Sequence, residues 1–560
     1  MLIDMIHDNH GEPPLRTRFR DPTLLKSYGY QAIVIPDALA ALPSAQQDLP
    51  PQIITSPNSL KPADLESSID LRVAAAVAAD LQVFFYGDAL LLPRTLIEKH
   101  PTRYLCDDNS AHSPSPKLCP GKPAVLAALA DNITELFDRW PQASGLIMRT
   151  GEVYPEATPH MLGSPLHATI CPSCRHLTLI DRLVHFIQLM HDTVVVQLQR
   201  TYIHRAWQPH FAGLPNMHDD PAVYRSIADR LPQSEQLVFS FKFTRGDFRN
   251  SPAANPCLRA DARPKWIEFQ CEREFEGKGA FPNYQAPAWQ KILTDLQFSA
   301  TPAEAAAGHS PHLSLWGWSR GGGWGGPYVQ REEWIDANVF ALARLYANPL
   351  ANISDIATTW AGLTFGIAES SPPAPAITEL LTLSAPAIRQ LLYCAALPED
   401  AIAPCVRDDL LDVTALWATA LRVVELGRHE EALAEKAEGL RLIDRMRHVW
   451  DLVSADLPNK SQARDLSGSL LLYNSFANTV VHLFAGFIHY LRWHRTGKNS
   501  SDLAALATEH LSQAQTHWQQ HTQHHALLPG APSLFQENTL WDRTHDCLEE
   551  LRSPPPHPSV

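Results

Sequence analysis

Along the first 325 residues, short apolar runs rich in β-branched and aromatic residues alternate with longer stretches of helical periodicity. A short apolar run followed by an amphipathic stretch is the pattern of a strand followed by a helix. Eight runs predict strands, at residues 2–6, 31–38, 81–90, 144–152, 201–207, 237–243, 265–272 and 313–319. Eight such units predict a (β/α)₈ barrel, whose active site lies at the C-terminal ends of its strands.

After the glycine-rich segment 321–327 the pattern becomes helical, with no further strand-like run. Residues 433–453 place leucine, isoleucine, methionine and tryptophan at helical spacing, which is typical of a helix packed in a bundle. We therefore expect a barrel over residues 1–325, an all-α domain over 326–548 and a disordered, proline-containing tail over 549–560.

The composition is that of a globular protein, with 560 residues, of which 45% are hydrophobic and 19% charged. The formal net charge is −14 and no block of like charge tracks a phosphate backbone, so we expect no nucleic-acid partner. No apolar run approaches the ~20 residues that a membrane span needs. The N-terminus has no basic segment ahead of an apolar one, as a secretory signal would. These features predict a cytoplasmic protein with no membrane partner.

Carboxylates lie at the ends of the predicted fourth, sixth and seventh strands: Glu152, Asp247 and Glu268. Cleavage of a glycosidic bond needs one carboxylic acid to protonate the leaving oxygen and a second carboxylate to activate water or attack. Acids at a barrel mouth also pair with neighbouring arginines, which is the alternative for each one taken singly. Three acids at three strand ends favour a shared catalytic site.

Cations lie beside these acids at Arg149, Arg205 and Lys242. A lysine inside an apolar strand either pairs with an acid or receives an anionic ligand, because lysine is rarely buried unpaired. Cations next to carboxylates suit a substrate that is both a sugar and an acid.

The predicted last strand and the segment after it carry Trp316, Trp318 and Trp324. Such tryptophans either stack on a sugar ring or pack between the barrel and the helical domain. His7, after the first strand, is a further candidate for substrate contact.

The N-terminal group His7, Asp8, His10 and Glu12 raises the alternative of a metal-dependent barrel hydrolase. However, His-x-x-His on an extended segment does not place both imidazoles on one side, because side chains alternate with period two. We therefore expect no catalytic metal and no cofactor.

Four cysteines follow the third and fourth strands, at positions 106, 119, 171 and 174. Four thiolates would in principle form a structural zinc site. The first pair lacks the short spacing of zinc ligands, so the spacing favours ordinary thiols.

Four segments resemble the family-67 α-glucuronidases, namely residues 146–156 (LIMRTGEVYPE), 237–249 (LVFSFKFTRGDFR), 265–279 (KWIEFQCEREFEGKG) and 331–360. Members of that family are inverting glycoside hydrolases with a (β/α)₈ barrel and a C-terminal helical domain. The resemblance covers roughly residues 140–365. It implies release of α-linked glucuronic or 4-O-methylglucuronic acid from xylan-derived oligosaccharides, and a homodimer through the helical domain.

By that resemblance Glu152 is the general acid, and Asp247 and Glu268 together activate the attacking water. Lys242 and Arg205 would bind the uronate carboxylate. Lys242 and Asp247 match the family's Lys-x-x-x-x-Asp motif. Inversion predicts about 6.5–9.5 Å between the acid and base carboxyls.

The chain departs from the family in two respects. The family has a lysine at the position of Met148, and it has a β-rich domain ahead of the barrel, whereas the first predicted strand here begins at residue 2. The chain therefore resembles a short or divergent member. Two other functions stay open: a glycoside hydrolase of the same architecture with a different sugar, and a non-catalytic carbohydrate-binding barrel.

Overall fold

The structure, a computed structural model, describes residues 1–7, 17–47, 62–107, 117–153, 158–167, 171–209, 213–249, 253–298, 313–321, 329–397, 405–406, 410–411, 413–528 and 541–552. Eight parallel strands close into a barrel in the order β1-β10-β9-β8-β7-β5-β3-β2. They are β1 (Leu2–Ile6), β2 (Ala32–Pro36), β3 (Gln82–Asp88), β5 (Gly145–Arg149), β7 (Thr201–Arg205), β8 (Leu237–Lys242), β9 (Lys265–Gln270) and β10 (Leu313–Arg320). The predicted (β/α)₈ barrel is confirmed, and each strand coincides with one of the apolar runs.

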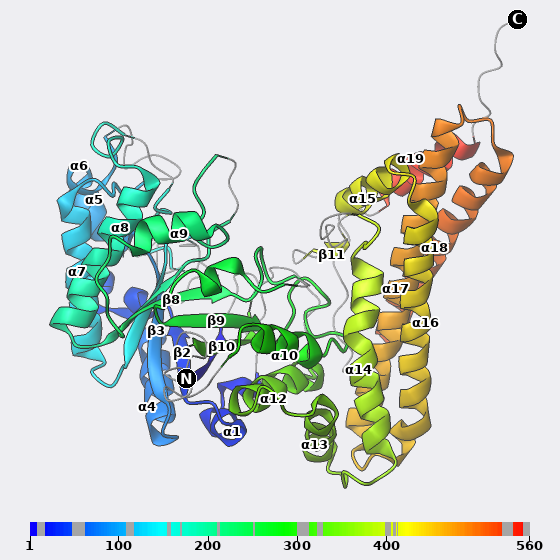
Figure 1. Cartoon of the computed structure of the whole chain (residues 1–560), viewed down its shortest axis with the longest axis horizontal. Coiled ribbons are helices and arrows are strands. Elements are labelled where there is room, and N and C mark those ends of the chain that lie inside the picture. The colour runs from blue at the N-terminus through cyan, green and yellow to red at the C-terminus, as the bar shows by residue number, and fades with distance from the viewer. Residues whose placement is uncertain are drawn as a thin grey trace, which may run out of the picture.

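Helices surround the barrel, as Figure 1 shows. They are α1 (Pro22–Tyr28), α2 (Pro43–Gln46), α4 (Pro62–Ala78), α5 (Arg94–Lys99), α6 (Pro101–Tyr104), α7 (Pro123–Arg139), α8 (Leu179–Met190), α9 (Pro221–Ala228) and α10 (Ala286–Asp295). Short 3₁₀ helices lie at Arg18–Arg20, Ala38–Ala41 and Pro256–Arg259, and a π-helical segment at His191–Gln197. The start of α8 follows local capping chemistry, because the Thr178 hydroxyl accepts from the Asp181 amide.

Two long connections at the C-terminal ends of the strands contain their own small sheet. Strand β4 (Leu91–Pro93), after β3, pairs antiparallel with β6 (Met161–Gly163), after β5. The connections that follow β3 and β5 are therefore joined to each other as well as to the barrel.

The helical domain follows β10. It comprises α12 (Glu333–Ala347), α13 (Ile353–Phe365), α14 (Pro373–Leu392), α15 (Val413–Glu425), α16 (His429–Val453), α17 (Lys460–Arg495), α18 (Ser501–Leu527) and α19 (Asp542–Arg552), with a 3₁₀ turn at Ser454–Asp456. One departure from the helical pattern is a hairpin of β11 (Cys405–Val406) and β12 (Leu410–Leu411). Runs of two residues are too short for a period-two pattern to reveal.

Helix α17 is long and apolar enough to span a membrane by length and composition, and within the described residues it is the one such helix. Its most apolar window is nevertheless 72% buried inside the protein. Its neighbours in the domain include α15, α16 and α18. The apolar surface of α17 therefore serves as the core of the helical domain.

The two domains are joined by buried polar contacts and stacked rings. The Asn338 side chain on α12 donates to the carbonyls of Cys271 and Asn283, both at 3.0 Å. Phe281 stacks on Tyr473 of α17, with ring centroids 4.4 Å apart. The segment after β9 is thus held between the barrel and the helices.

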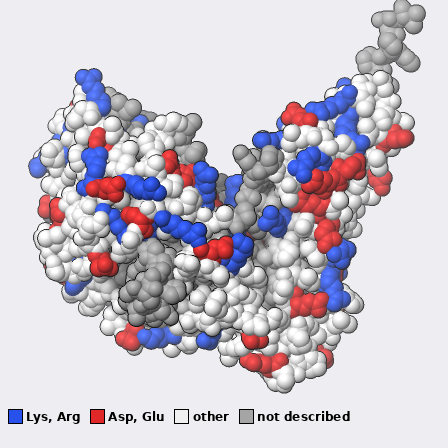
Figure 2. Space-filling view, viewed as in Figure 1, with Lys and Arg blue, Asp and Glu red and all other residues white. Residues whose placement is uncertain are grey.

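In Figure 2 a notch separates the outer parts of the two domains, and charges of both signs are interspersed over this face.

The C-terminal helix extends further than the sequence predicted. Helix α19 reaches Arg552, so the helical domain does not end at residue 548. Glu550 on this helix accepts hydrogen bonds from Tyr490 and Lys498 of the neighbouring segment. These tertiary contacts stabilise a helical end that local composition assigns to the tail; residues 553–560 lie outside the described residues.

Candidate active site

The C-terminal parts of neighbouring barrel strands place charged side chains in register. Asp88 on β3 lies beside Arg149 on β5, and Arg149 lies beside Arg205 on β7. Lys242 on β8 lies beside Glu268 on β9. Because side chains alternate along a strand, residues in register on neighbouring parallel strands project to the same side. The five side chains therefore meet at the mouth of the barrel.

Arg149 connects two carboxylates at this mouth. Its Nε and Nη2 donate to the two oxygens of Asp88 at 2.8 and 2.9 Å, and its Nη1 donates to Oε2 of Glu152 at 2.6 Å. The same Glu152 oxygen accepts from the Trp207 indole at 3.2 Å. These hydrogen bonds fix the Glu152 carboxylate. The side chain is 13% exposed, so solvent still reaches it.

Gly151 allows this arrangement. A Cβ added there would lie 2.3 Å from the Cβ of Gln208, in the segment that follows β7. Only glycine therefore lets the segment after β5 approach so closely, and this approach brings Glu152 next to Trp207.

Opposing influences act on the pKa of Glu152. Burial raises the pKa, but the positive charges of Arg149, Lys242 and Arg205 lower it, and Asp247 raises it. The net result is a pKa below the ordinary value, because the cations stabilise the carboxylate. In the unliganded protein Glu152 is therefore ionised at neutral pH.

Arg205 and Glu268 form a buried ion pair. The Arg205 Nε donates to both Glu268 oxygens at 3.1 and 3.0 Å, and Nη2 lies 2.9 Å from Oε2. The Ser240 hydroxyl also donates to Glu268, and Arg205 Nη1 donates to the Tyr86 hydroxyl at 3.2 Å. The Glu268 side chain is 0% exposed, so its oxygens are turned away from solvent.

Lys242 and Asp247 form a second pair, between two aromatic rings. The Lys242 ammonium is buried and donates to Asp247. It lies 3.4 Å from the centre of the Trp207 ring and 4.4 Å from that of Phe248. Burial lowers the pKa of Lys242, and Asp247 opposes this shift. The Asp247 side chain is 22% exposed, the most accessible of the three predicted catalytic acids.

Trp316 and Trp318 lie beside the Arg205 guanidinium. Their rings stack at 5.2 Å, and the guanidinium lies 4.7 Å from Trp318 and 5.8 Å from Trp316. Trp316 is fully buried and Trp318 is 6% exposed. His7, at the end of β1, is partly exposed, with its ring centre 6.4 Å from that of Tyr86. The two tryptophans therefore pack against the Arg205 guanidinium, and His7 lies at the edge of the site.

Three further residues of the site were not among the candidates from the sequence: Tyr86, Trp207 and Ser240. Each lies two residues from a charged residue of the site or in register with one. Tyr86 precedes Asp88 by two, Trp207 follows Arg205 by two, and Ser240 precedes Lys242 by two. Period-two alternation is the signal that identifies them. Asp8, His10, Glu12 and Trp324 lie outside the described residues.

No protein-family model matches this chain, and no curated protein matches its sequence. The solved structure of a GH138 enzyme targeting pectin rhamnogalacturonan II is similar at a TM-score of 0.61 and 12% identity, covering 99% of this chain and 83% of that chain. An O-GlcNAc hydrolase variant of Thermobaculum terrenum is similar at 0.42 and 10% identity, over 98% and 93% of the two chains. CpGH89 from Clostridium perfringens is similar at 0.39 and 8% identity, over 93% and 62%.

These structural neighbours are glycoside hydrolases, and the likeness to the GH138 enzyme shows a fold shared along nearly the whole chain. Membership of family 67 stays a prediction.

Proposed function

We propose that this protein is a glycoside hydrolase in which Glu152 is the general acid and Asp247 the general base. One observation carries the proposal: a chain of contacts through Trp207 and Lys242 links the two carboxylates. The Trp207 indole donates to Glu152, and its ring contacts the Lys242 ammonium, which binds Asp247. Both carboxylates remain partly exposed. Two accessible carboxylates linked through one aromatic and one cationic side chain suit acid and base work on one glycosidic bond.

Glu268 has a different role in this proposal from the one that the resemblance implies. Its carboxylate is fully buried and occupied by Arg205 and Ser240. A general base needs a free oxygen within reach of water. We assign Glu268 to holding Arg205 in position, as a positioning residue.

For the substrate, we propose α-linked glucuronic or 4-O-methylglucuronic acid on xylan-derived oligosaccharides, released with inversion. Arg149 donates to Glu152, and the positive charges of Arg205 and Lys242 also lower the Glu152 pKa. A uronate carboxylate near them would offset their charge, so that the burial of Glu152 would raise its pKa. An acidic sugar would thereby convert Glu152 into the protonated form that a general acid requires, and a neutral sugar would not.

The similarity to the GH138 enzyme over 99% of the chain suggests a second substrate panel. The test therefore includes oligosaccharides from rhamnogalacturonan II, the target of that enzyme, beside the aldouronic acids.

The decisive experiment follows sugar release from both panels by NMR, which also identifies the anomer formed first. We expect free uronic acid as the β-anomer from an α-linked substrate. Asp247→Asn is expected to lose activity as severely as Glu152→Gln. Binding of the oligosaccharides without turnover would overturn the enzyme proposal in favour of a carbohydrate-binding barrel. Release of neutral sugars alone would keep the hydrolase and reject the uronate.

A kinetic comparison of Asp247→Asn with Glu268→Gln tests the division of roles. Loss of the base removes turnover whatever the substrate concentration. Loss of the positioning residue is expected mainly to raise KM for the uronate through a displaced Arg205. The opposite pattern would return Glu268 to the role of base.

A further inference from the structure

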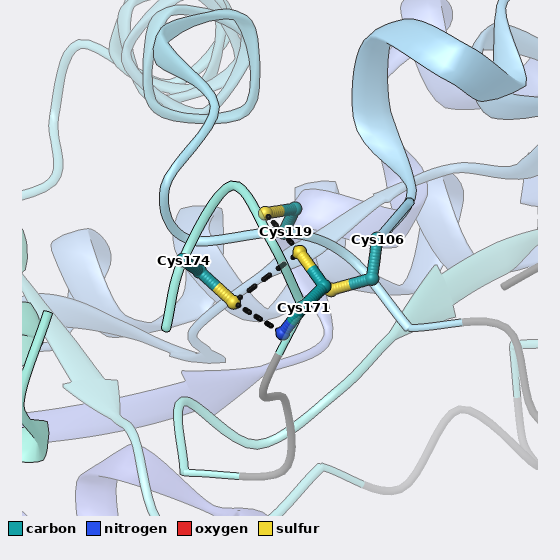
Figure 3. A group of neighbouring side chains, drawn as sticks. All are labelled: Cys106, Cys119, Cys171 and Cys174. Carbon is teal, nitrogen blue, oxygen red and sulfur yellow. Dashed lines mark hydrogen bonds between the residues drawn. The ribbon is translucent and has the colours of Figure 1, made fainter. Parts of the chain in front are cut away.

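Four cysteines from two separate connections meet in one buried cluster, which Figure 3 shows. The sulfur atoms of Cys106, Cys119, Cys171 and Cys174 all lie within 4.8 Å of one another, and all four side chains are buried and free of disulfides. Two of the separations are 3.6 Å, between Cys119 and Cys171, and 3.4 Å, between Cys171 and Cys174. A disulfide would bring two sulfurs to about 2.05 Å. The ligands of a tetrahedral zinc ion, each about 2.3 Å from the metal, are about 3.8 Å apart.

The first pair is brought together by a short antiparallel bridge between Leu105 and Leu118. The Cys106 amide donates to the Lys117 carbonyl at 3.0 Å, and the Cys119 amide donates to the Tyr104 carbonyl at 2.9 Å. Cysteines that follow directly on the two sides of such a bridge lie next to each other. Cys106 and Cys119 are therefore neighbours in space, although 13 positions separate them in the sequence.

The second pair lies in the turn Cys171–Cys174. The amides of Cys174 and Arg175 donate to the Cys171 carbonyl at 3.0 and 2.8 Å, and the Cys171 amide donates to the Cys174 sulfur at 3.2 Å. This turn places two sulfurs on one side and directs a backbone N–H to one of them, an arrangement that stabilises a thiolate.

The two pairs are fastened to each other. The Ser173 amide and hydroxyl donate to Asp107 at 3.2 and 2.5 Å, and Asp107 pairs with Lys122 at 2.8 Å. A Cβ added at Gly121 would lie 2.4 Å from the Ser173 carbonyl oxygen, so the two backbones touch. The cluster is therefore a preformed frame built from contacts on both connections.

Positive charge lies beside the cluster. Lys122 donates to the Leu105 carbonyl at 2.6 Å, and Arg182 donates to the Cys174 carbonyl at 3.1 Å. Zinc with four thiolates carries a net charge of −2, which nearby cations offset. The four cysteines also form a buried group separate from the main apolar core. A site that served only packing would use larger apolar side chains, since four sulfurs fill little volume.

We propose that Cys106, Cys119, Cys171 and Cys174 bind one structural Zn²⁺ ion. Four protein ligands leave no open coordination position, so the ion would serve stability and not catalysis. Binding releases the thiol protons to solvent and forms four zinc–sulfur bonds. The proposal is independent of the glycosidase proposal.

The position of the cluster gives the ion a specific structural role. Cys106 and Cys119 belong to the connection after β3, and the other two cysteines belong to the connection after β5. The connection after β5 begins with the segment that carries Glu152. The zinc ion, together with the pairing of β4 with β6, would hold the two connections together at the barrel mouth.

The proposal is tested by the metal content of the purified full-length protein, measured by elemental mass spectrometry. We expect one zinc per chain in the wild type and in the control Cys547→Ser, which removes a buried free cysteine from α19. Cys174→Ser is expected to lose the zinc or to bind it at least 10-fold more weakly. Zinc retained by Cys174→Ser, or a wild-type chain with iron or without metal, would overturn the proposal.

A second measurement decides the matter even if Cys174→Ser fails to fold. Replacement of the metal by Co²⁺ in the wild type is expected to produce the intense near-ultraviolet sulfur-to-cobalt absorption and the visible bands of a tetrahedral thiolate site. Titration of the unfolded protein in chelator should then find these cysteines as free thiols. Absence of the cobalt bands, or recovery of the four cysteines as disulfides, would contradict a zinc site.

Discussion

Two clusters of cation–carboxylate pairs lie at the C-terminal ends of the barrel strands, and they differ in access to solvent. In the first, called the mouth cluster, Arg149 pairs with Asp88 and Glu152, and Lys242 pairs with Asp247. The exposed fractions of Glu152 and Asp247 are 13% and 22%. In the second, called the interface cluster, the side chains are 0–6% exposed; its members are Glu272, Arg273, Glu276, Arg320 and Glu332.

The interface cluster is closed by the helical domain. Glu276 accepts from Arg273 and Asn283, and also from Tyr393 at the end of α14. Arg320 of β10 donates to Glu332 directly before α12. Both clusters pair cations with carboxylates, and the interface cluster differs in being covered by α12 and α14. Access to solvent therefore separates the clusters: the proposed catalytic acids of the mouth cluster are partly exposed, and the acids of the interface cluster are sealed beside the helical domain.

The largest expected effect is on catalysis, through the mouth cluster. Glu152→Gln removes the transferable proton, so kcat should fall by about 10³-fold, equal to about 4 kcal/mol of transition-state stabilisation. Thermal stability should stay close to that of the wild type, because Arg149 keeps Asp88 as its partner. Steady-state kinetics and calorimetry check both parts. Activity within tenfold of the wild type would show that Glu152 is not the acid.

Glu276→Gln, in the interface cluster, should show the reverse pattern. It leaves the Arg273 charge buried without its carboxylate, which typically destabilises a protein by about 3 kcal/mol. We expect a lower free energy of unfolding in denaturant titration and an unchanged kcat for the folded protein. A variant with lost activity and unchanged stability would place Glu276 in the chemistry and break the distinction between the two clusters.

The pH dependence of the mouth cluster sharpens the comparison. The pKa of Glu152 is lowered in the free protein, so kcat/KM should decline as pH rises through that low value and the acid loses its proton. Once a uronate offsets the cations, the pKa in the complex rises, and the basic limb of kcat should lie about one pH unit or more higher. Profiles of both constants on an acidic and a neutral substrate check this. Coincident basic limbs on the uronate would contradict the proposed role of its carboxylate.

The smallest expected effect concerns a group of half-buried to buried histidines between α17 and α18. His482 lies 2.9 Å from His510, Nδ1 to Nδ1, and His489 and His517 stack against these two rings. Burial, followed by the neighbouring histidines, lowers the pKa of His482 to about 4, and burial likewise lowers that of His489 to about 4. Near pH 7 both imidazoles are therefore neutral in the folded domain, and their burial carries no cost of desolvating a charge.

Since unfolded histidine has a pKa near 6.5, the unfolded chain takes up these protons first as the pH falls. Stability is thus complete above about pH 6.5 and declines between about pH 6.5 and 4. We expect the melting temperature to fall by about 2–4 °C from pH 7 to pH 5. The double variant His482→Gln/His489→Gln should show less of this decline. An equal decline in wild type and variant would assign the acid sensitivity elsewhere.

Much of the barrel follows from its local pattern, while the end of the chain does not. All eight strands lie at the predicted apolar runs, because burial on both faces requires continuous apolar residues. Glu152, Asp247 and Glu268 were predicted to share a site, and the pairings among strands explain why their strand ends meet. Residues 549–552 were misassigned to the tail, because Tyr490 and Lys498, which stabilise that helical end, lie far away in the sequence.

The sequence by itself determined the repeating βα pattern, the change to helices after the last strand, and the placing of charged residues at strand ends. Period-two and period-3.6 alternation are local properties, so they can be recognised without knowledge of the fold. Only the tertiary structure decided which acid each cation binds, that Glu268 is sealed while Asp247 is open, and that two distant cysteine pairs form one cluster. Those outcomes depend on how separate connections pack against one another, and sequence spacing carries no record of that packing.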